Sequence, residues 1–474
     1  MTDLHYLDAT TALRQFQSKE LSPVELMRAV IERHEQVGEP INAYTETMYD
    51  EALDAARDAE TRYQQGVERP GLLGLPVATK EKHAIAGRRL SQGLSWRSDH
   101  KSDVSHPIVE RIRNAGGIVH ARTTSPEYSC ASVTHSPLWG VTRNPWNLEY
   151  SPGGSSGGSG AALAAGLTTL ATASDIAGST RIPASFTGTV GYKAPYGRIP
   201  GMPPLSADPY RGDGPMARTV ADAALLSNVM IGRHPADHTS LWPGLPIPVR
   251  AEGVTGMRTA LCVRLGDYPV TNEVERNTRA VADALSDAGA TVDEIELPWT
   301  TREIGETTFT HFGHILGPAM EDETAGHEEE LAAYTRQFMA DARASAERTR
   351  FVDGLRTETR MQYEFASAMS GFDALICPTS CTPALDAEGD YLDGIDVDGV
   401  HLQHYWESHL TSPFNIANRC PVLAVPSGIA ANAVPTGVQI VGHPYDDATV
   451  FRIGAAVEHA RPWGTNHPNI EFVR

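Results

Sequence analysis

The chain has 474 residues, of which 41% are hydrophobic and 21% charged, as in a large globular protein with ample material for a core. Its formal net charge of −20 argues against nucleic acid or an anionic membrane as partner, because both need a basic surface. No leader-like N-terminus, membrane-length apolar run or zinc-like cysteine spacing is present, so we expect a cytoplasmic protein with reduced thiols and without metal or cofactor.

Helical patterns dominate the N-terminal part of the chain, over about residues 7–66. In LSPVELMRAVIERH, Ser22 is a candidate cap, Pro23 takes the first helical position and Glu25 completes a capping box. The pattern then changes, because LLGLPVATK predicts a short buried strand that ends at Lys80. PIVERIRNAGGIVHAR predicts a helix, a glycine stop and a second strand.

The same order of helix, glycine and strand recurs in the second half. MRTALCV, TVDEIELP, FDALICPT, PVLAVPSG and GVQIVG predict strands, and residues 327–369 predict long helices. Strands that alternate with helices favour an α/β fold, with a large mixed and twisted central sheet flanked by helices. We expect a single domain over 1–474, with a variable insertion or subdomain at about 230–370.

A glycine- and serine-rich stretch, SPGGSSGGSGAALAAG, occupies residues 151–166. A flexible linker is disfavoured, because the stretch runs directly into an apolar segment, and a phosphate-binding loop would need a Lys-Ser or Lys-Thr pair that is missing. The pattern G-x-S-x-G fits around Ser155 and again around Ser156, as in the nucleophile elbow of α/β-hydrolases. The elbow needs a preceding strand, which NPWNLEYSP does not predict, so a serine esterase of this type stays the alternative.

A second turn of small residues, ASDIAGSTRIPAS, contains Ser179. Two serines and a lysine can provide a nucleophile and a base without histidine. The run GGSSGGSGAALAAGLTTLATASDIAGSTRIPAS resembles the signature of the amidase signature family. LPVATK, AGGIVHARTTSPEY, GVTRNPWN, GYKAPYGRIP, DALICPT and GVQIVGHPYDDATVFRIGAAVE resemble further family landmarks in family order. The resemblance extends over the chain except about 230–370.

The resemblance implies a hydrolase that cleaves a non-peptide carbon–nitrogen bond through an acyl-enzyme. By family position, Ser179 is the nucleophile, Ser155 is a cis-peptide serine that relays the proton, and Lys80 is the general base. A lysine with its ordinary pKa of about 10.4 is charged at neutral pH and cannot act as a base. We therefore predict that Lys80 is buried, away from carboxylates, and neutral.

The resemblance also implies an oxyanion hole made of backbone N–H groups. It consists of Ile176, Ala177 and Gly178 together with Ser179 itself. The family usually has two glycines before the nucleophile, and here one of them is Ala177. Alanine keeps its N–H, but its methyl group restricts φ and narrows the space beside the acyl carbonyl.

Charged residues near these turns need separate assignment. Lys82 is a rival base, since strand periodicity would put it on the same face as Lys80. The family commonly has Asp-Asn after its lysine, whereas Glu81 and Lys82 follow here. Asp175 and Arg181 flank the nucleophile turn, and we expect them to be a structural pair.

Substrate choice follows only loosely from the resemblance. Family members cleave carboxamides, aryl acylamides and acyl hydrazides, while amidotransferase A-type subunits typically carry Gln where this chain has Ile182, so that function is a further alternative. The expected substrate-binding residues are Tyr128, Ser129 and Cys130, and an apolar pocket with aromatic walls would suit a benzoyl-type amide or hydrazide. The expected partner is this small molecule, with a homodimer possible.

Overall fold

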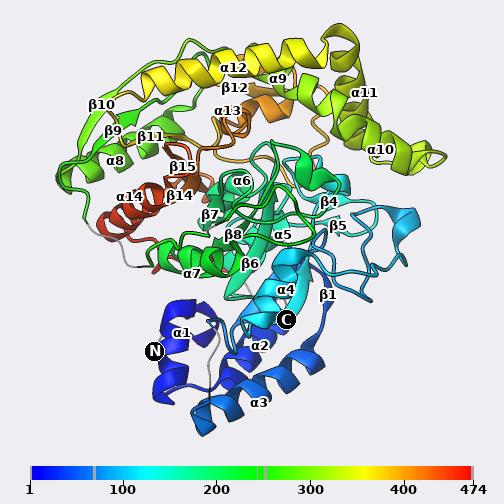
Figure 1. Ribbon diagram of the computed structural model, residues 1–474, viewed down its shortest axis with the longest axis vertical. Helices are drawn as coiled ribbons and strands as arrows, with labels where there is room; N and C mark the ends of the chain where they lie inside the picture. Colours follow the sequence, from blue (N-terminus) through cyan, green and yellow to red (C-terminus); the bar gives the residue numbers. More distant parts are fainter. Residues whose placement is uncertain (1–2, 68–70, 243, 250–252, 471–474) are drawn as a thin grey trace.

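One large sheet crosses the whole protein in the computed structural model, which describes residues 3–67, 71–242, 244–249 and 253–470 (Figure 1). This sheet has 11 strands in the order β1 (Tyr44–Thr47), β3 (Ile118–Thr123), β2 (Pro76–Lys80), β6 (Leu170–Asp175), β8 (Gly212–Ala217), β7 (Val190–Lys193), β14 (Val422–Ile429), β15 (Pro435–Gly442), β11 (Ala374–Pro378), β9 (Arg258–Leu261) and β10 (Thr291–Glu294). β3, β2 and β6 are parallel, as are β11, β9 and β10, while the strands between them are antiparallel. The mixed sheet that the sequence predicts is confirmed.

Helices cover this sheet and extend beyond it. They are α1 (Ala9–Ser18), α2 (Pro23–Ile41), α3 (Tyr49–Gln65), α4 (Pro107–Asn114), α5 (Gly157–Ala164), α6 (Arg181–Thr187), α7 (Val220–Met230), α8 (Asn272–Asp287), α9 (Thr301–His314), α10 (Leu316–Thr324), α11 (Ala333–Arg348), α12 (Phe351–Ala368), α13 (Pro413–Ile416) and α14 (Asp447–Ala460). Two small hairpins complete the fold, formed by β4 (His135–Ser136) with β5 (Gly140–Val141) and by β12 (Ile395–Val397) with β13 (Val400–Leu402). None of the helices in the described part of the chain is both long and apolar enough to cross a membrane.

The N-terminal helices confirm most of the local expectations. Ser22 accepts the N–H of Val24 at 3.0 Å and donates its own N–H to Glu25 at 2.8 Å, so the predicted capping box is present with Pro23 at the start of α2. One element was not expected, because β1 interrupts the segment that reads as helical. It exists because an edge of the sheet is open beside β3, with which β1 pairs antiparallel.

The glycine- and serine-rich stretch forms the start of a buried helix, not a linker. Every residue of α5 is buried. A Cβ at Gly158 would lie 2.5 Å from the backbone nitrogen of Thr124, and one at Gly160 would lie 2.8 Å from the hydroxyl oxygen of Thr187. The glycines therefore let α5 pack closely against its neighbours. No strand leads directly into Ser155, since the last strand before it, β5, ends at Val141, so the context of a nucleophile elbow is missing.

The region at about 230–370 contributes both to the sheet and to its cover. Its strands β9 and β10 join the sheet beside β11. Its helices α9 to α12 form an arc at the end of the molecule opposite to α1–α3 (Figure 1). The predicted long helices are present, and each has a buried face. Helices α9, α10 and α11 of this arc lie over the strand ends at which the candidate site is located.

Candidate active site

The sheet topology brings the expected catalytic segments together at one end of the central strands. β2 and β6 are parallel and end at Lys80 and Asp175, and antiparallel β8 begins opposite Asp175, at Gly212. The ends of these three strands therefore lie side by side. The turn after β6 carries Ser179 into α6, and the turn before α5 carries Ser155.

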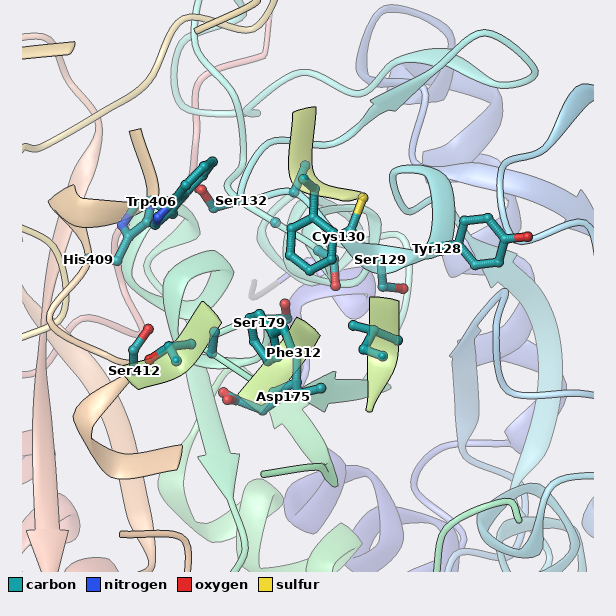
Figure 2. A pocket seen from close by; sticks show the side chains of 18 of the residues that line it. Tyr128, Ser129, Cys130, Ser132, Asp175, Ser179, Phe312, Trp406, His409 and Ser412 are labelled. Atoms are coloured by element: carbon teal, nitrogen blue, oxygen red, sulfur yellow. Dashed lines mark hydrogen bonds between the residues drawn. The ribbon is translucent and has the colours of Figure 1, made fainter. Parts of the chain in front are cut away.

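A cavity with about 1270 Å³ of free space, partly continuous with solvent, opens at these strand ends (Figure 2). Ser155 and Ser179 line it, and so do the expected substrate-binding residues Tyr128, Ser129 and Cys130. Figure 2 shows the Tyr128 hydroxyl pointing away from Ser179. Thus the structure gathers around one cavity the residues that the sequence analysis selected from separate segments.

Lys80 is fully buried among hydroxyl groups. Its Nζ lies 2.7 Å from Oγ of Ser155, and 3.1 Å from the Oγ atoms of both Ser156 and Ser174. Among the residues that the structure describes, no carboxylate lies within ion-pair distance of this nitrogen. Burial lowers the pKa of Lys80 well below its ordinary value, and the nearby positive charge of Lys82 adds to this effect more than Asp213 opposes it. Both effects favour the neutral form of the amine.

The hydroxyl groups around Lys80 match the hydrogen bonds that a neutral amine can form. It has two protons to donate and one lone pair to accept. The Ser156 hydroxyl donates to the carbonyl of Ser174 at 3.4 Å, so its oxygen accepts from Lys80. Ser174 Oγ accepts the second proton, which leaves the lone pair of the amine for the hydroxyl proton of Ser155. This arrangement points the Ser155 proton at Lys80 and frees the Ser155 oxygen to accept from another hydroxyl.

The second half of the expected relay is close but not connected. The Gly154–Ser155 peptide bond is cis, as the resemblance implies. The N–H of Ser156 donates to the carbonyl of Ser179 at 3.1 Å, which joins the two turns through their backbones. Within the described residues no hydrogen bond links the side chains of Ser155 and Ser179. Ser179 is 9% exposed and Ser155 is not exposed at all, so Ser179 is the hydroxyl that a molecule in the cavity can reach.

The backbone at Ser179 departs in one respect from the expected oxyanion hole. The N–H of Gly178 donates to Oδ1 of Asp175 at 2.8 Å and is therefore occupied. The N–H groups of Ile176, Ala177 and Ser179 have no acceptor among the described residues. Since a free N–H beside a cavity can stabilise a developing oxyanion, the set of candidate donors changes from the expected four to these three.

Gly178 has a requirement of its own. Its φ is +126°, a conformation that side chains rarely adopt, and a Cβ there would lie 2.2 Å from Oγ1 of Thr411. The Thr411 hydroxyl donates to the carbonyl of Ala177. Thr411 thus fixes the position of this turn by its hydrogen bond. A side chain is accepted at Ala177, whereas at Gly178 both the backbone conformation and the contact with Thr411 exclude one.

Asp175 and Arg181 form the structural pair that the sequence analysis expects. The Arg181 guanidinium donates from Nε to Oδ2 of Asp175 at 2.9 Å and from Nη2 to Oδ1 at 2.8 Å, and both side chains are buried. Gln439 and Asn415 accept further hydrogen bonds from it, each at 2.6 Å. Burial alone would raise the pKa of Asp175, but the charge and hydrogen bonds of Arg181 lower it to about 2.

The rival base Lys82 does not reach the serines. β2 ends at Lys80, so the alternation that predicts a shared face no longer applies two residues later. Lys82 is half-buried and lines the cavity. Its neighbour Glu81 turns away and accepts the N–H groups of Ser91 and Gln92 at 2.5 and 3.0 Å. Of the two lysines, Lys80 is therefore the one that contacts the serines.

One cluster behind Lys80 has the composition of a metal site. Asp213 lies between His83 and His106, with Oδ1 2.9 Å from Nε2 of His83 and Oδ2 3.4 Å from Nε2 of His106. The N–H of Ile108 donates to Nδ1 of His106 at 3.3 Å, so the proton of that ring is on Nε2 and faces Asp213. Burial lowers the pKa of His83 to about 3, so this ring is neutral as well. The three groups satisfy one another by hydrogen bonds, and the cluster ties β8 to the end of β2.

An apolar wall of the cavity was not identified residue by residue from the sequence. Most of it comes from α9, α10 and α11. Its large members are Ile304, Phe309, Phe312, Leu316, Met320 and Phe338, together with Trp406. In Figure 2, Ser179 and Phe312 lie near the centre of the view, between Tyr128 on one side and Trp406 on the other. Helical periodicity marks these residues as buried, but it does not say that they face a cavity.

Helix α11 also holds the loop of the expected substrate-binding residues. The buried carboxylate of Glu127 accepts the Thr335 hydroxyl at 2.6 Å and the N–H of Ala332 at 2.9 Å. The Sγ of Cys130 lies 3.8 Å from Oγ1 of Thr335, and burial raises the pKa of this thiol to about 12. Cys130 is thus a neutral, unreactive part of the wall.

Comparisons with known proteins agree with this arrangement. The profile of the family described as Amidase matches residues 25–451. An acylamidase from Rhodococcus erythropolis is 31% identical over 477 residues, which cover 98% of each chain. The A-type subunit of the glutamyl-tRNA(Gln) amidotransferase of Geobacter metallireducens is 30% identical over 485 residues, covering 95% of this chain and 96% of that protein.

The fold has close counterparts among solved structures. A bacterial aryl acylamidase of the amidase signature enzymes superimposes with a TM-score of 0.91 at 27% sequence identity, over 98% of both chains. The A-type subunit of the glutamyl-tRNA(Gln) amidotransferase of Thermotoga maritima superimposes with a TM-score of 0.81 at 27% identity, over 100% of this chain and 99% of that chain. Both hydrolases and amidotransferase subunits therefore share this architecture.

Proposed function

The chain belongs to the amidase signature family, whose enzymes hydrolyse amides, and from this premise we propose that it cleaves carboxamide, aryl acylamide or acyl hydrazide bonds through an acyl-enzyme on Ser179. The observation that carries the proposal is the contact of 2.7 Å between Nζ of Lys80 and Oγ of Ser155, in a buried site that lowers the pKa of the amine and so favours its neutral form. A neutral amine can remove a proton, which an ammonium cannot do.

The reaction begins when Oγ of Ser179 attacks the substrate carbonyl. Its proton passes to Ser155, whose own proton passes to Lys80, and the new tetrahedral oxyanion accepts from the free N–H groups of Ile176, Ala177 and Ser179. The hydroxyls of Ser155 and Ser179 close to hydrogen-bond distance when substrate is bound, since such contacts are often long in unliganded enzymes. Lys80 returns its proton through Ser155 to the leaving nitrogen as the carbon–nitrogen bond breaks.

Water then releases the acyl group by the same route. It attacks the ester carbonyl while Ser155 and Lys80 accept its proton, and Ser179 recovers its hydrogen as the carboxylic acid leaves. The oxyanion donors act in both steps, because each passes through a tetrahedral intermediate. No metal or cofactor takes part in this scheme.

The shape and polarity of the cavity favour a linear substrate with an aromatic or apolar group. Phe309, Phe312 and Trp406 offer ring faces, and Phe309 stacks on Trp406 with ring centroids 4.7 Å apart. Such a wall binds a benzoyl or anilide group by burying apolar area. The acylamidase relatives support this choice by analogy.

An amidotransferase function is the second candidate, because relatives with that name are about as similar as the acylamidase. Ile182 follows Arg181 where those subunits typically carry Gln, and it lines the cavity. A glutamine substrate would place its polar side chain against this apolar wall, which costs free energy unless each polar group finds a partner. We therefore favour the hydrolase.

The deciding experiment combines labelling and turnover. A fluorophosphonate probe followed by peptide mapping is expected to modify Ser179, whereas modification of Ser155 or Ser156 would support the esterase elbow. A panel of benzoyl 4-nitroanilide, benzohydrazide and glutamine is then assayed. Hydrolysis of the aromatic substrates is expected, and activity on glutamine alone would support the amidotransferase function.

A further inference from the structure

Two basic side chains line the cavity without a hydrogen-bond or ion-pair partner among the described residues. Lys82 follows the end of β2 and Arg211 directly precedes β8, so both lie at the strand ends beside which Ser179 is located. Each is half-buried. Over the part of the chain that the structure describes, neither side chain makes a hydrogen bond or an ion pair. Buried or half-buried charges are normally paired, so a pair of free cations in a cavity is unusual.

The acidic groups nearby are committed elsewhere. Those that line the cavity are Asp175, Glu323 and Glu407. Asp175 is paired with Arg181 at 2.8 Å, and Arg97 lies 3.3 Å from Glu323. Glu407 accepts the N–H of His404 at 3.0 Å. Asp213, behind the wall, accepts from His83 and His106.

The two cations also act on each other. Burial is the main cause that lowers the pKa of Lys82, and the charge of Arg211 contributes, to a value of about 7. The same guanidinium lowers the pKa of Lys80, the lysine that contacts Ser155. Arg211 therefore acts electrostatically on both amines, and it lines the same cavity as Lys82 and Ser179. An anion between Lys82 and Arg211 would relieve their repulsion and restore the charge of Lys82.

We propose that Lys82 and Arg211 form a subsite for a carboxylate of the substrate, so that the amide cleaved at Ser179 carries this anionic group on the same molecule. This inference rests on the proposed function, which it narrows to one class of substrate. A planar guanidinium and an ammonium together suit a carboxylate, because each can donate charge-assisted hydrogen bonds to its oxygens. Lys82 and Arg211 together carry two positive charges, and the negative charge of Asp213 offsets one of them. A ligand with a single negative charge would neutralise the other, which favours a carboxylate over a phosphate.

The test uses a matched pair of substrates. One is glutaryl 4-nitroanilide, and the other is its isostere in which a methyl group replaces the charged oxygen of the carboxylate to give a methyl ketone. We expect the acid to have a kcat/KM at least about tenfold higher, the worth of one hydrogen bond to a charged group. In Lys82→Gln and in Arg211→Gln this ratio falls toward one, and in Arg211→Lys it falls less.

The control is Arg302→Gln on the outer side of α9, where the side chain is 87% exposed and weakly paired with Glu306. It removes the same charge from the protein but is expected to leave the ratio unchanged. A ratio of one or less in the parent protein would overturn the proposal. An undiminished ratio in both cavity variants would do so as well.

A binding measurement separates this proposal from the proposed function. Glutarate and inorganic phosphate are each titrated calorimetrically into the parent protein and into Arg211→Gln. Glutarate binding that is weakened at least about tenfold in the variant supports the subsite even if neither anilide is hydrolysed, a result that would count only against the proposed function. No glutarate binding to the parent, or binding of phosphate in its place, would overturn the carboxylate assignment.

Discussion

The side-chain nitrogen of Lys80 and the hydroxyl oxygen of Ser155 lie 2.7 Å apart in a site that solvent does not reach. Three hydroxyls surround the amine, and the carboxylate of Asp213, which opposes the loss of its proton, is held by two histidines. Burial disfavours the charged form of a lysine, so this environment holds the pKa of Lys80 well below its ordinary value. This pair forms one end of the proposed proton path, and the first predictions concern it.

Replacement of Lys80 by methionine is expected to lower kcat/KM for an aryl acylamide by about three orders of magnitude or more, the usual contribution of a general base. Lys80→Arg keeps a cation but cannot be deprotonated, so it is expected to be as inactive. The measurement is release of 4-nitroaniline. Lys82→Met is the matched control, and a loss of hydrolysis of the neutral substrate in that variant as large as in Lys80→Met would assign the base to Lys82.

The neutral state of Lys80 also predicts a pH dependence of stability. Its pKa is lower in the folded than in the unfolded protein, so the unfolded chain binds more protons at neutral pH and the free energy of unfolding rises with pH. This penalty disappears as the pH approaches the unfolded value of about 10.4. Urea unfolding is expected to show Lys80→Met more stable than the parent at pH 6, with the difference shrinking toward pH 9. A constant difference would contradict a neutral buried amine.

The three serines are expected to respond differently to alanine substitution. Ser179→Ala removes the nucleophile, so it abolishes fluorophosphonate labelling as well as turnover. Ser155→Ala interrupts the proton path and slows labelling by about 10²- to 10⁴-fold, as for other proton-transfer groups. Ser156→Ala removes one acceptor of the Lys80 amine, 3.1 Å away, and is expected to cost less than Ser155→Ala. The reverse order would contradict the relay.

Loss of Arg181 is expected to destabilise the fold. Arg181→Met leaves the carboxylate of Asp175 buried without its partner, which costs about 3–5 kcal/mol in the free energy of unfolding. Arg181→Lys keeps the charge but loses the two-point contact, so an intermediate loss is expected. Because the pKa of Asp175 is about 2, below its unfolded value, the stabilisation is present above about pH 4 and is lost as pH falls toward 2. Denaturant unfolding at pH 7 and pH 3 measures both effects.

The apolar wall is expected to set the preference for aromatic substrates. Trp406→Ala removes a ring that lines the cavity and is predicted to raise KM for a benzoyl anilide roughly tenfold, from the apolar area no longer buried. The smaller acetyl anilide is expected to change less. Trp242, which is 75% exposed, provides the control Trp242→Ala, with no change for either substrate. Equal effects of Trp406→Ala on both substrates would argue against an aromatic subsite.

Several features of the site were accessible from local patterns and from family resemblance. The apolar run before Lys80 predicts a strand that ends there, and β2 does. The pairing of Asp175 with Arg181 was expected from their position beside the nucleophile turn. Other features were not accessible, because they join segments far apart. Asp213 reaches His83 across 130 residues, and the N–H of Gly178 is taken by Asp175 through the detailed shape of the turn.

By itself, the sequence determined the alternation of strands and helices, because apolar periodicity and short-range turn chemistry are local properties of a chain. It also carries the family resemblance, from which the residues of the proposed reaction were taken. Only the tertiary structure decided which charges stay free and which are paired. Lys82 and Arg211 are ordinary cations in the sequence, and the pairing of β2 and β8 with β6 brings them to one cavity, where neither forms an ion pair with a described residue. Burial, distance and partner set the charge state of a side chain, and all three are properties of the folded protein.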